Sequence, residues 1–137
     1  MKLKFILVSI LLVSLTSFAN IPQAEKQALI DLYQSTQGDL WNTSWNLDAA
    51  PTTWEGVIIK NDRVVSLKLV NNNLVGQLPE SLGNLSALTV LNLHNNKIEG
   101  TIPTNILRID NLKILNLSLN QLSGTIPDVS TDRKSVV

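Results

Sequence analysis

The sequence predicts an α/β solenoid with an N-terminal cap, and three observations support this prediction. From Val64 onward the residues repeat with a period of 24, since Gly76, Gly100 and Gly124 are each separated by that interval. Each repeat begins with a short alternation of apolar residues, which is typical of a β-strand. Residues 20–63 contain a helical apolar stripe and a hairpin pattern ahead of the first repeat. A fixed period in this range indicates stacked coils.

Residues 1–19 predict a secretory signal peptide. Lys2 and Lys4 give it a positive start, Phe5–Leu15 is an almost uninterrupted apolar run, and small residues favour cleavage after Ala19. The apolar run is shorter than the roughly 20 residues that a membrane-spanning helix needs. We therefore expect an exported protein, secreted or at the cell surface (periplasmic or on the outer surface in a bacterium), with no membrane span after signal removal.

Composition narrows the classes of function. The chain has 11 Lys and Arg against 11 Asp and Glu, and loss of Lys2 and Lys4 with the signal leaves it slightly acidic. Proteins that bind nucleic acid carry basic patches, so we expect no nucleic-acid partner. The chain has no cysteine, which excludes disulfides in an exported protein. Its 137 residues allow one domain.

Each repeat contains the parts of one solenoid coil. The pattern Val64-x-x-Leu67-x-Leu69 is typical of a short strand, with Leu67 and Leu69 on one face. Asn72, pointing inward, supplies donors and an acceptor to backbone groups where the coil turns. Gly76 allows a backbone conformation that other residues avoid. The matching columns are Leu67, Leu91 and Leu115; Leu69, Leu93 and Leu117; Asn72, Asn96 and Asn120; and Pro79, Pro103 and Pro127, while Leu82, Leu85 and Leu88 continue the apolar face.

These columns resemble the plant-type subclass of leucine-rich repeats, L-x-x-L-x-L-x-x-N-x-L-x-G-x-I-P. Residues 88–103 fit this pattern at every fixed position, and the resemblance covers Val64 to Pro127. It implies a right-handed leucine-rich-repeat coil with a parallel sheet on its concave side. The expected repeats are 64–87, 88–111 and a partial unit at 112–131.

Residues 20–63 predict the cap that covers the first coil. The apolar spacing from Ala24 to Thr36 indicates a helix, and the polar stretch at 60–63 indicates the turn of a hairpin. This helix-plus-hairpin order is similar to the N-terminal cap of bacterial secreted or surface leucine-rich-repeat proteins. Three tryptophans, Trp41, Trp45 and Trp54, supply apolar bulk. We favour core packing for them over the alternative of a sugar-binding platform, because Trp is mostly buried on average.

Residues 132–137 break the repeat, since Asp132 stands where the register calls for an apolar residue. The segment resembles an in-frame translation of a common sequencing-adapter DNA. We therefore expect a non-native tail on a truncated gene fragment whose natural form continues with more repeats. Re-sequencing of the locus tests this expectation, and a genuine stop codon after Val137 would contradict it. The alternative is a naturally short protein with an exposed last coil.

The outward strand positions are expected to line the concave face, which is the usual binding surface of a solenoid. The alternative is that these residues face water without a special role. His94 is the only histidine and has no cysteine or acid at ligand spacing, so we expect no metal site and no cofactor. No catalytic motif is found, and we expect no enzymatic activity. The expected ligand-binding residues are Lys68, Val70, Asn92, His94, Asn116 and Ser118, with Ser66, Val90 and Ile114 as a third column.

Three functions are compatible with the sequence. The favoured one is a non-catalytic extracytoplasmic binding module that recognises a protein, peptide or glycan through the concave face. The second is the ligand-sensing end of a larger receptor kinase or surface enzyme. The third is a structural adhesin in which the repeats supply length. Further sequence downstream would distinguish the second and third from the first.

Overall fold

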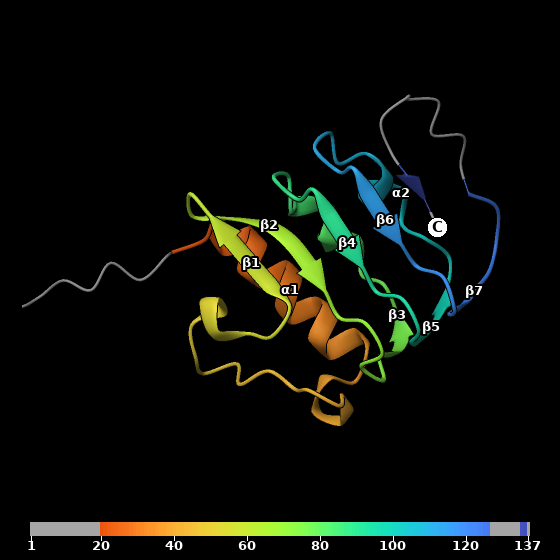
Figure 1. Ribbon diagram of the computed structural model, residues 1–137, viewed down its shortest axis with the longest axis horizontal. Helices are drawn as coiled ribbons and strands as arrows, with labels where there is room; N and C mark the ends of the chain where they lie inside the picture. The colour runs from red at the N-terminus through yellow and green to blue at the C-terminus, as the bar shows by residue number, and fades with distance from the viewer. Residues whose placement is uncertain (1–19, 127–134, 137) are drawn as a thin grey trace, which may run out of the picture.

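A computed structural model describes residues 20–126 and 135–136. The expected signal peptide at 1–19, the end of the third repeat at 127–131 and most of the expected tail at 132–137 lie outside these residues, and the origin of that tail stays a prediction. The described chain is an α/β solenoid with parallel strands, as expected, and its coils follow one another across the molecule (Figure 1).

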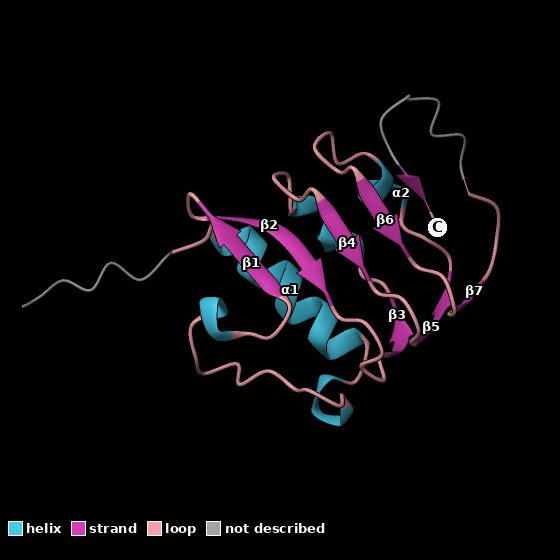
Figure 2. Ribbon diagram, in the orientation of Figure 1, coloured by secondary structure: helices cyan, strands magenta, loops and turns pink. Residues whose placement is uncertain are grey.

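The larger sheet has five strands in the order β1-β2-β4-β6-β8. Residue pairs 24 positions apart lie side by side, so Leu67 pairs with Leu91 and Leu91 with Leu115. The helices lie behind this sheet and leave its other face free of helical cover (Figure 2). The strands are β1 (Val57–Lys60), β2 (Arg63–Lys68), β4 (Val90–Asn92), β6 (Ile114–Asn116) and β8 (Ser135–Val136).

A second, three-stranded parallel sheet was not expected from the sequence. It consists of β3 (Val75–Gln77), β5 (Lys97–Gly100) and β7 (Gln121–Leu122), in that order. Each coil therefore crosses two sheets before it returns through a short helical turn. These turns are η3 (Glu80–Asn84) in the first repeat and α2 (Thr104–Leu107) in the second.

The cap has the predicted helix and hairpin. Helix α1 (Gln23–Ser35) follows Pro22 and agrees with the expected helix to within one residue at each end. Strand β1 pairs antiparallel with β2. Asn61 and Asp62 between them both have positive φ angles, of 50° and 57°, as a tight hairpin turn requires. Two short helical turns, η1 (Gly38–Leu40) and η2 (Pro51–Thr53), complete the cap.

The three tryptophans belong to the core of the cap. Trp41, Trp45 and Trp54 are only 3–5% exposed. Trp45 and Trp54 stack with ring centroids 4.9 Å apart. Each indole N–H donates to a backbone carbonyl, that of Thr36, Glu55 and Asn46 respectively. This burial confirms the packing role and rules out an open aromatic platform.

One continuous core runs from the cap into the repeats. It includes cap residues such as Leu29 and Leu32 and the repeat leucines of all three coils. The predicted apolar residues of the return segment, Leu82, Leu85 and Leu88, are fully buried. The inward asparagines also hold the expected positions, because Asn120 Oδ1 accepts a hydrogen bond from the Ile98 N–H of the preceding coil at 2.9 Å.

A buried carboxylate joins the cap helix to the first repeat strand. Glu25, on α1, is 1% exposed and accepts a hydrogen bond from the Val64 N–H at 2.8 Å. It also forms an ion pair with Arg63. No pattern in the sequence indicates this contact, which fixes where the helix lies against β2.

Candidate functional site

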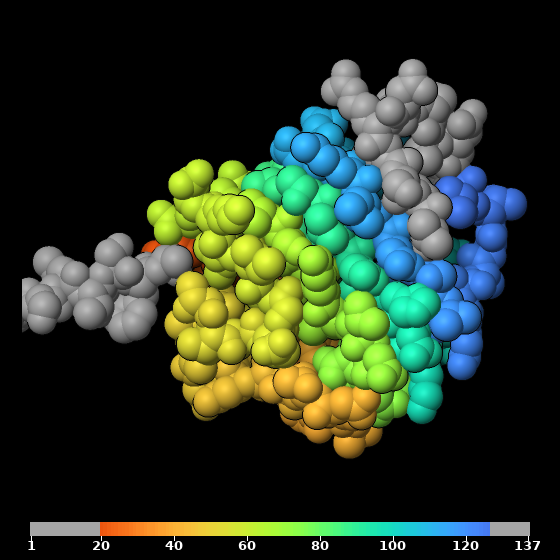
Figure 3. Space-filling view, viewed as in Figure 1, coloured from red at the N-terminus to blue at the C-terminus, as the bar shows by residue number. Residues whose placement is uncertain are grey.

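The candidate site is the helix-free face of the larger sheet, which we call the concave face. It consists of the outward side chains of β2, β4 and β6 and of the residues just after these strands. The coils cross this face as successive bands (Figure 3). Parallel pairing places Lys68, Asn92 and Asn116 in one column and Ser66, Val90 and Ile114 in another, as the sequence predicts.

Ser66 differs from the expectation, because it is buried instead of facing solvent. Its side chain is 6% exposed, since β1 lies beside β2 and places Ile58 opposite Ser66. Within the described residues its hydroxyl has no hydrogen-bond partner. The antiparallel cap strand thus narrows the predicted face at its N-terminal edge.

The column that contains Ser66 continues onto the cap as a largely apolar row. Ile58 and Ile114 are 44% and 46% exposed, and Val90 between them is half-buried. Ile58 was not among the expected face residues. Neighbouring side chains of a strand point to opposite faces, so the buried Val57 and the outward Ile58 could have been assigned from the hairpin pattern. We call Ile58, Val90 and Ile114 the apolar row.

The asparagines of the neighbouring column use their oxygen atoms within their own coil. Asn92 Oδ1 accepts a hydrogen bond from the His94 N–H, and Asn116 Oδ1 accepts one from the Ser118 N–H, both at 3.1 Å. Since an N–H can only donate, the atom facing it must be the amide oxygen, which fixes the orientation of each amide. Neither Nδ2 group has a hydrogen-bond partner among the described residues.

His94 and Ser118 connect two coils. His94 Nδ1 lies 2.7 Å from Ser118 Oγ, and Ser118 Oγ donates to Asn116 Oδ1 at 2.7 Å. A hydroxyl has a single proton, so Nδ1 must carry the proton in its contact with Ser118. Ser118 is therefore an acceptor toward the histidine and does not have the arrangement of an activated nucleophile.

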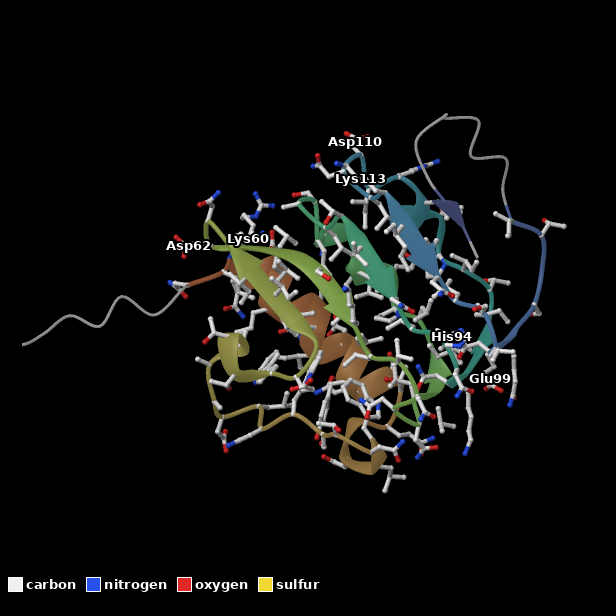
Figure 4. All side chains as sticks on the ribbon, in the orientation of Figure 1. Lys60, Asp62, His94, Glu99, Asp110 and Lys113 are labelled. Atoms are coloured by element: carbon white, nitrogen blue, oxygen red, sulfur yellow. The ribbon has the colours of Figure 1, made fainter. Side chains whose placement is uncertain are left out.

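The remaining two expected site residues are exposed. Lys68 lies in the column of Asn92 and Asn116, and its ammonium has no hydrogen-bond or ion-pair partner in the described part of the chain. Val70 is 45% exposed. None of the outward positions of the concave face is acidic, although the chain has as many acids as bases. Figure 4 shows His94 and Glu99 at one end of the coils and Lys60, Asp62, Asp110 and Lys113 at the other.

The described residues contain neither a cluster of metal-binding side chains nor a membrane-spanning helix. No group of three or more histidine, cysteine or acidic side chains is placed to hold a metal ion. No helix in residues 20–126 has the length and apolar character needed to cross a bilayer.

Comparison with known proteins agrees with this architecture. The Leucine Rich Repeat family model matches residues 63–85, 87–109 and 111–131. A probable inactive leucine-rich repeat receptor-like protein kinase of Arabidopsis thaliana is 35% identical over 92 residues. The match covers 64% of this chain but 13% of that kinase, so this chain spans a small part of the relative.

Solved structures show the same fold. The crystal structure of PEPR1-AtPEP1 gives a TM-score of 0.69 at 29% identity, over 85% of this chain and 18% of that one. The Arabidopsis receptor kinase HAESA, in complex with the peptide hormone IDA and the co-receptor SERK1, gives 0.63 at 31% identity, over 77% and 18%. A leucine-rich repeat protein of Bacteroides thetaiotaomicron gives 0.62 at 16% identity, over 72% and 23%, and shows the fold alone.

The periodic columns, the stacked parallel strands and these matches define a solenoid repeat protein. The chain belongs to the leucine-rich-repeat family, with repeats of the plant-type subclass.

Proposed function

We propose that this chain is a non-catalytic recognition module that binds a protein or peptide ligand outside the cytoplasm through the concave face. The observation that carries the proposal is the open face itself, which combines exposed apolar side chains with polar groups that have no partner in the described chain. Such a combination suits a ligand that brings its own hydrogen-bonding groups. HAESA, which is similar in fold, is in complex with a peptide hormone.

A random peptide library displayed on phage tests this proposal. Selected peptides should bind the purified chain and lose most of their affinity for the Lys68→Ala/His94→Ala double variant, because both side chains lie on the proposed surface. Lys26→Ala, on the outer helix α1, serves as the control and should bind as the parent does. Failure to select any peptide, or equal binding by the double variant, would contradict the proposal.

A second candidate is the ligand-sensing end of a larger cell-surface receptor. The observation that favours it is that the 35% identical relative is a receptor-like kinase of which this chain spans 13%. The complete open reading frame tests the idea directly. A membrane-spanning segment followed by a kinase domain would support it, whereas an open reading frame that contains repeats alone would contradict it.

A further inference from the structure

The column formed by Lys68, Asn92 and Asn116 offers hydrogen-bond donors that have no partner among the described residues. Each amide oxygen accepts a backbone N–H at 3.1 Å, and Asn116 Oδ1 also accepts from the Ser118 hydroxyl, so the amide groups left without a partner in the described chain are the two Nδ2 groups. A lysine ammonium donates and cannot accept. We call these three residues the donor row.

The donor row and the apolar row lie side by side on β4 and β6, whereas on β2 the buried Ser66 lies beside Lys68 and the apolar row continues at Ile58 on β1. Ser66 and Lys68 are two residues apart on β2, as are Val90 and Asn92 on β4, and Ile114 and Asn116 on β6. Neighbouring strands lie about 4.8 Å apart, so the donor row spans about 9.6 Å. On β4 and β6 the apolar row thus lies beside the donor row, while the exposed Val70 lies beyond the donor row on the first coil.

From these rows we propose that the concave face binds an extended acidic peptide in which apolar residues alternate with aspartate or glutamate. This inference rests on the proposed function and adds the chemistry of the ligand. Successive side chains of an extended strand point to opposite sides, so a peptide lying between the rows directs its apolar residues to one row and its carboxylates to the other. Residues on one side are about 6.8 Å apart, which lets two carboxylates fit along the donor row.

Charge favours this ligand over a basic or neutral one. Carboxylates are acceptors, and Lys68 supplies a positive charge that no described residue neutralises. None of the outward residues of the concave face is acidic, so an incoming carboxylate meets no like charge there. His94 continues the polar side of the face, and its Nδ1 proton is directed to Ser118.

A double variant that replaces the two neutral amides of the donor row with carboxylates tests the proposal while keeping the local turns. In Asn92→Asp/Asn116→Asp, each carboxylate still accepts the backbone N–H that holds its turn, because Asp forms the same local turn as Asn. The outward donors become acceptors, so an end-blocked (Val-Glu)3 peptide should bind at least about tenfold more weakly and (Val-Lys)3 should gain affinity. Asn84→Asp, on the return turn η3, introduces a carboxylate away from the face and should leave both affinities unchanged.

Lys68→Gln gives a smaller and independent effect. It removes one exposed charge, so binding of (Val-Glu)3 should weaken about three- to fivefold. Raising the salt concentration should reduce the affinity of the parent and should have less effect on this variant. Lys26→Gln removes one positive charge from α1 and should change neither the affinity for (Val-Glu)3 nor its dependence on salt.

The phage library separates failure of this inference from failure of the proposed function. Selected peptides that alternate apolar and acidic residues, and that bind Asn92→Asp/Asn116→Asp poorly, support both. Peptides that lose affinity for Lys68→Ala/His94→Ala but are not enriched in acids would overturn the inference alone. Equal binding of (Val-Glu)3 and (Val-Lys)3 by the parent would do the same. A library that gives no face-dependent peptide would overturn both.

Discussion

Asn96 Oδ1 accepts hydrogen bonds from the backbone N–H groups of Asn72 and Leu74, each at 3.0 Å. Its Nδ2 group donates to the carbonyls of Leu69 and Leu93, at 2.7 and 2.9 Å. One buried side chain therefore satisfies backbone groups of two successive coils where both change direction. The chain bends sharply there without leaving these buried polar groups unpaired.

Asn96→Ala is predicted to lower the free energy of unfolding by about 2–4 kcal/mol, because two buried N–H groups lose their acceptor. Urea denaturation monitored by tryptophan fluorescence measures the change. Asn84→Ala is the control, since Asn84 is exposed, and it should change stability by less than about 0.5 kcal/mol. Equal effects of the two substitutions would show that the inward amide is not needed.

Glu25→Ala is predicted to cost about 2–3 kcal/mol of stability, since it removes a charged acceptor from the buried Val64 N–H. Arg63→Ala should cost less than about 1 kcal/mol, because the Arg63 side chain is 39% exposed and the ion pair is partly screened by solvent. Urea denaturation of both variants shows which substitution lowers the free energy of unfolding more. A larger loss for Arg63→Ala would mean that the ion pair, and not the backbone contact, anchors the cap.

Gly76→Ala is predicted to be more harmful than Gly100→Ala. Both glycines have positive φ angles, but a Cβ on Gly76 would lie 2.1 Å from the backbone oxygen of Ser35 at the end of α1. At Gly100 the nearest atom is in the flexible side chain of Gln77, at 3.1 Å. We expect Gly100→Ala to lower the free energy of unfolding by about 1–2 kcal/mol because of the φ angle alone. We expect Gly76→Ala to lower it by about 3 kcal/mol or more, because overpacking is added there. Thermal denaturation of the two variants side by side decides the order.

Tyr33, the only tyrosine, should ionise at higher pH in the folded protein than in urea. A hydrogen bond with Ser44 lowers its pKa, but the hydrogen bond to Asp39, burial and the negative charge of Asp39 together raise it above the ordinary value of 10.0. Because the pKa of Tyr33 is higher in the folded state, the protonated phenol contributes to the stability of the fold. This contribution is fully present below about pH 10 and is lost as the pH rises through the pKa of Tyr33 in the folded protein.

The ultraviolet absorbance of tyrosinate, followed against pH with and without urea, measures both pKa values. Asp39→Asn removes the negative charge beside the phenol and should move the folded pKa of Tyr33 downward. An identical midpoint in folded and urea-unfolded protein would contradict the prediction.

Much of the repeat architecture could be predicted from the sequence because its determinants recur. Leu67, Leu91 and Leu115 occupy the same place in three units, so a single register defines the strands, the core and the outward columns. The hairpin could be predicted equally well, since two apolar runs flank a short polar stretch.

The parts that were missed depend on single contacts between distant segments. Glu25 precedes Val64 by 39 positions, and an acid near the start of an amphipathic helix is usually exposed. The burial of Ser66 follows from the pairing of Ile58 with it, which the hairpin allowed but did not specify in register. The occupied oxygens of Asn92 and Asn116 arise from local turn geometry, which an outward position in a strand pattern does not reveal.

The antiparallel hairpin also determines at which edge of the larger sheet further coils can be added. Within the described residues β1 pairs only with β2, whereas every later strand of the larger sheet is parallel to its neighbour. Another coil could not dock on β1 in the register that the repeats share. Whole units could instead be inserted or deleted farther along without altering the contacts of α1, which makes the length of the recognition surface adjustable independently of the segment that starts it.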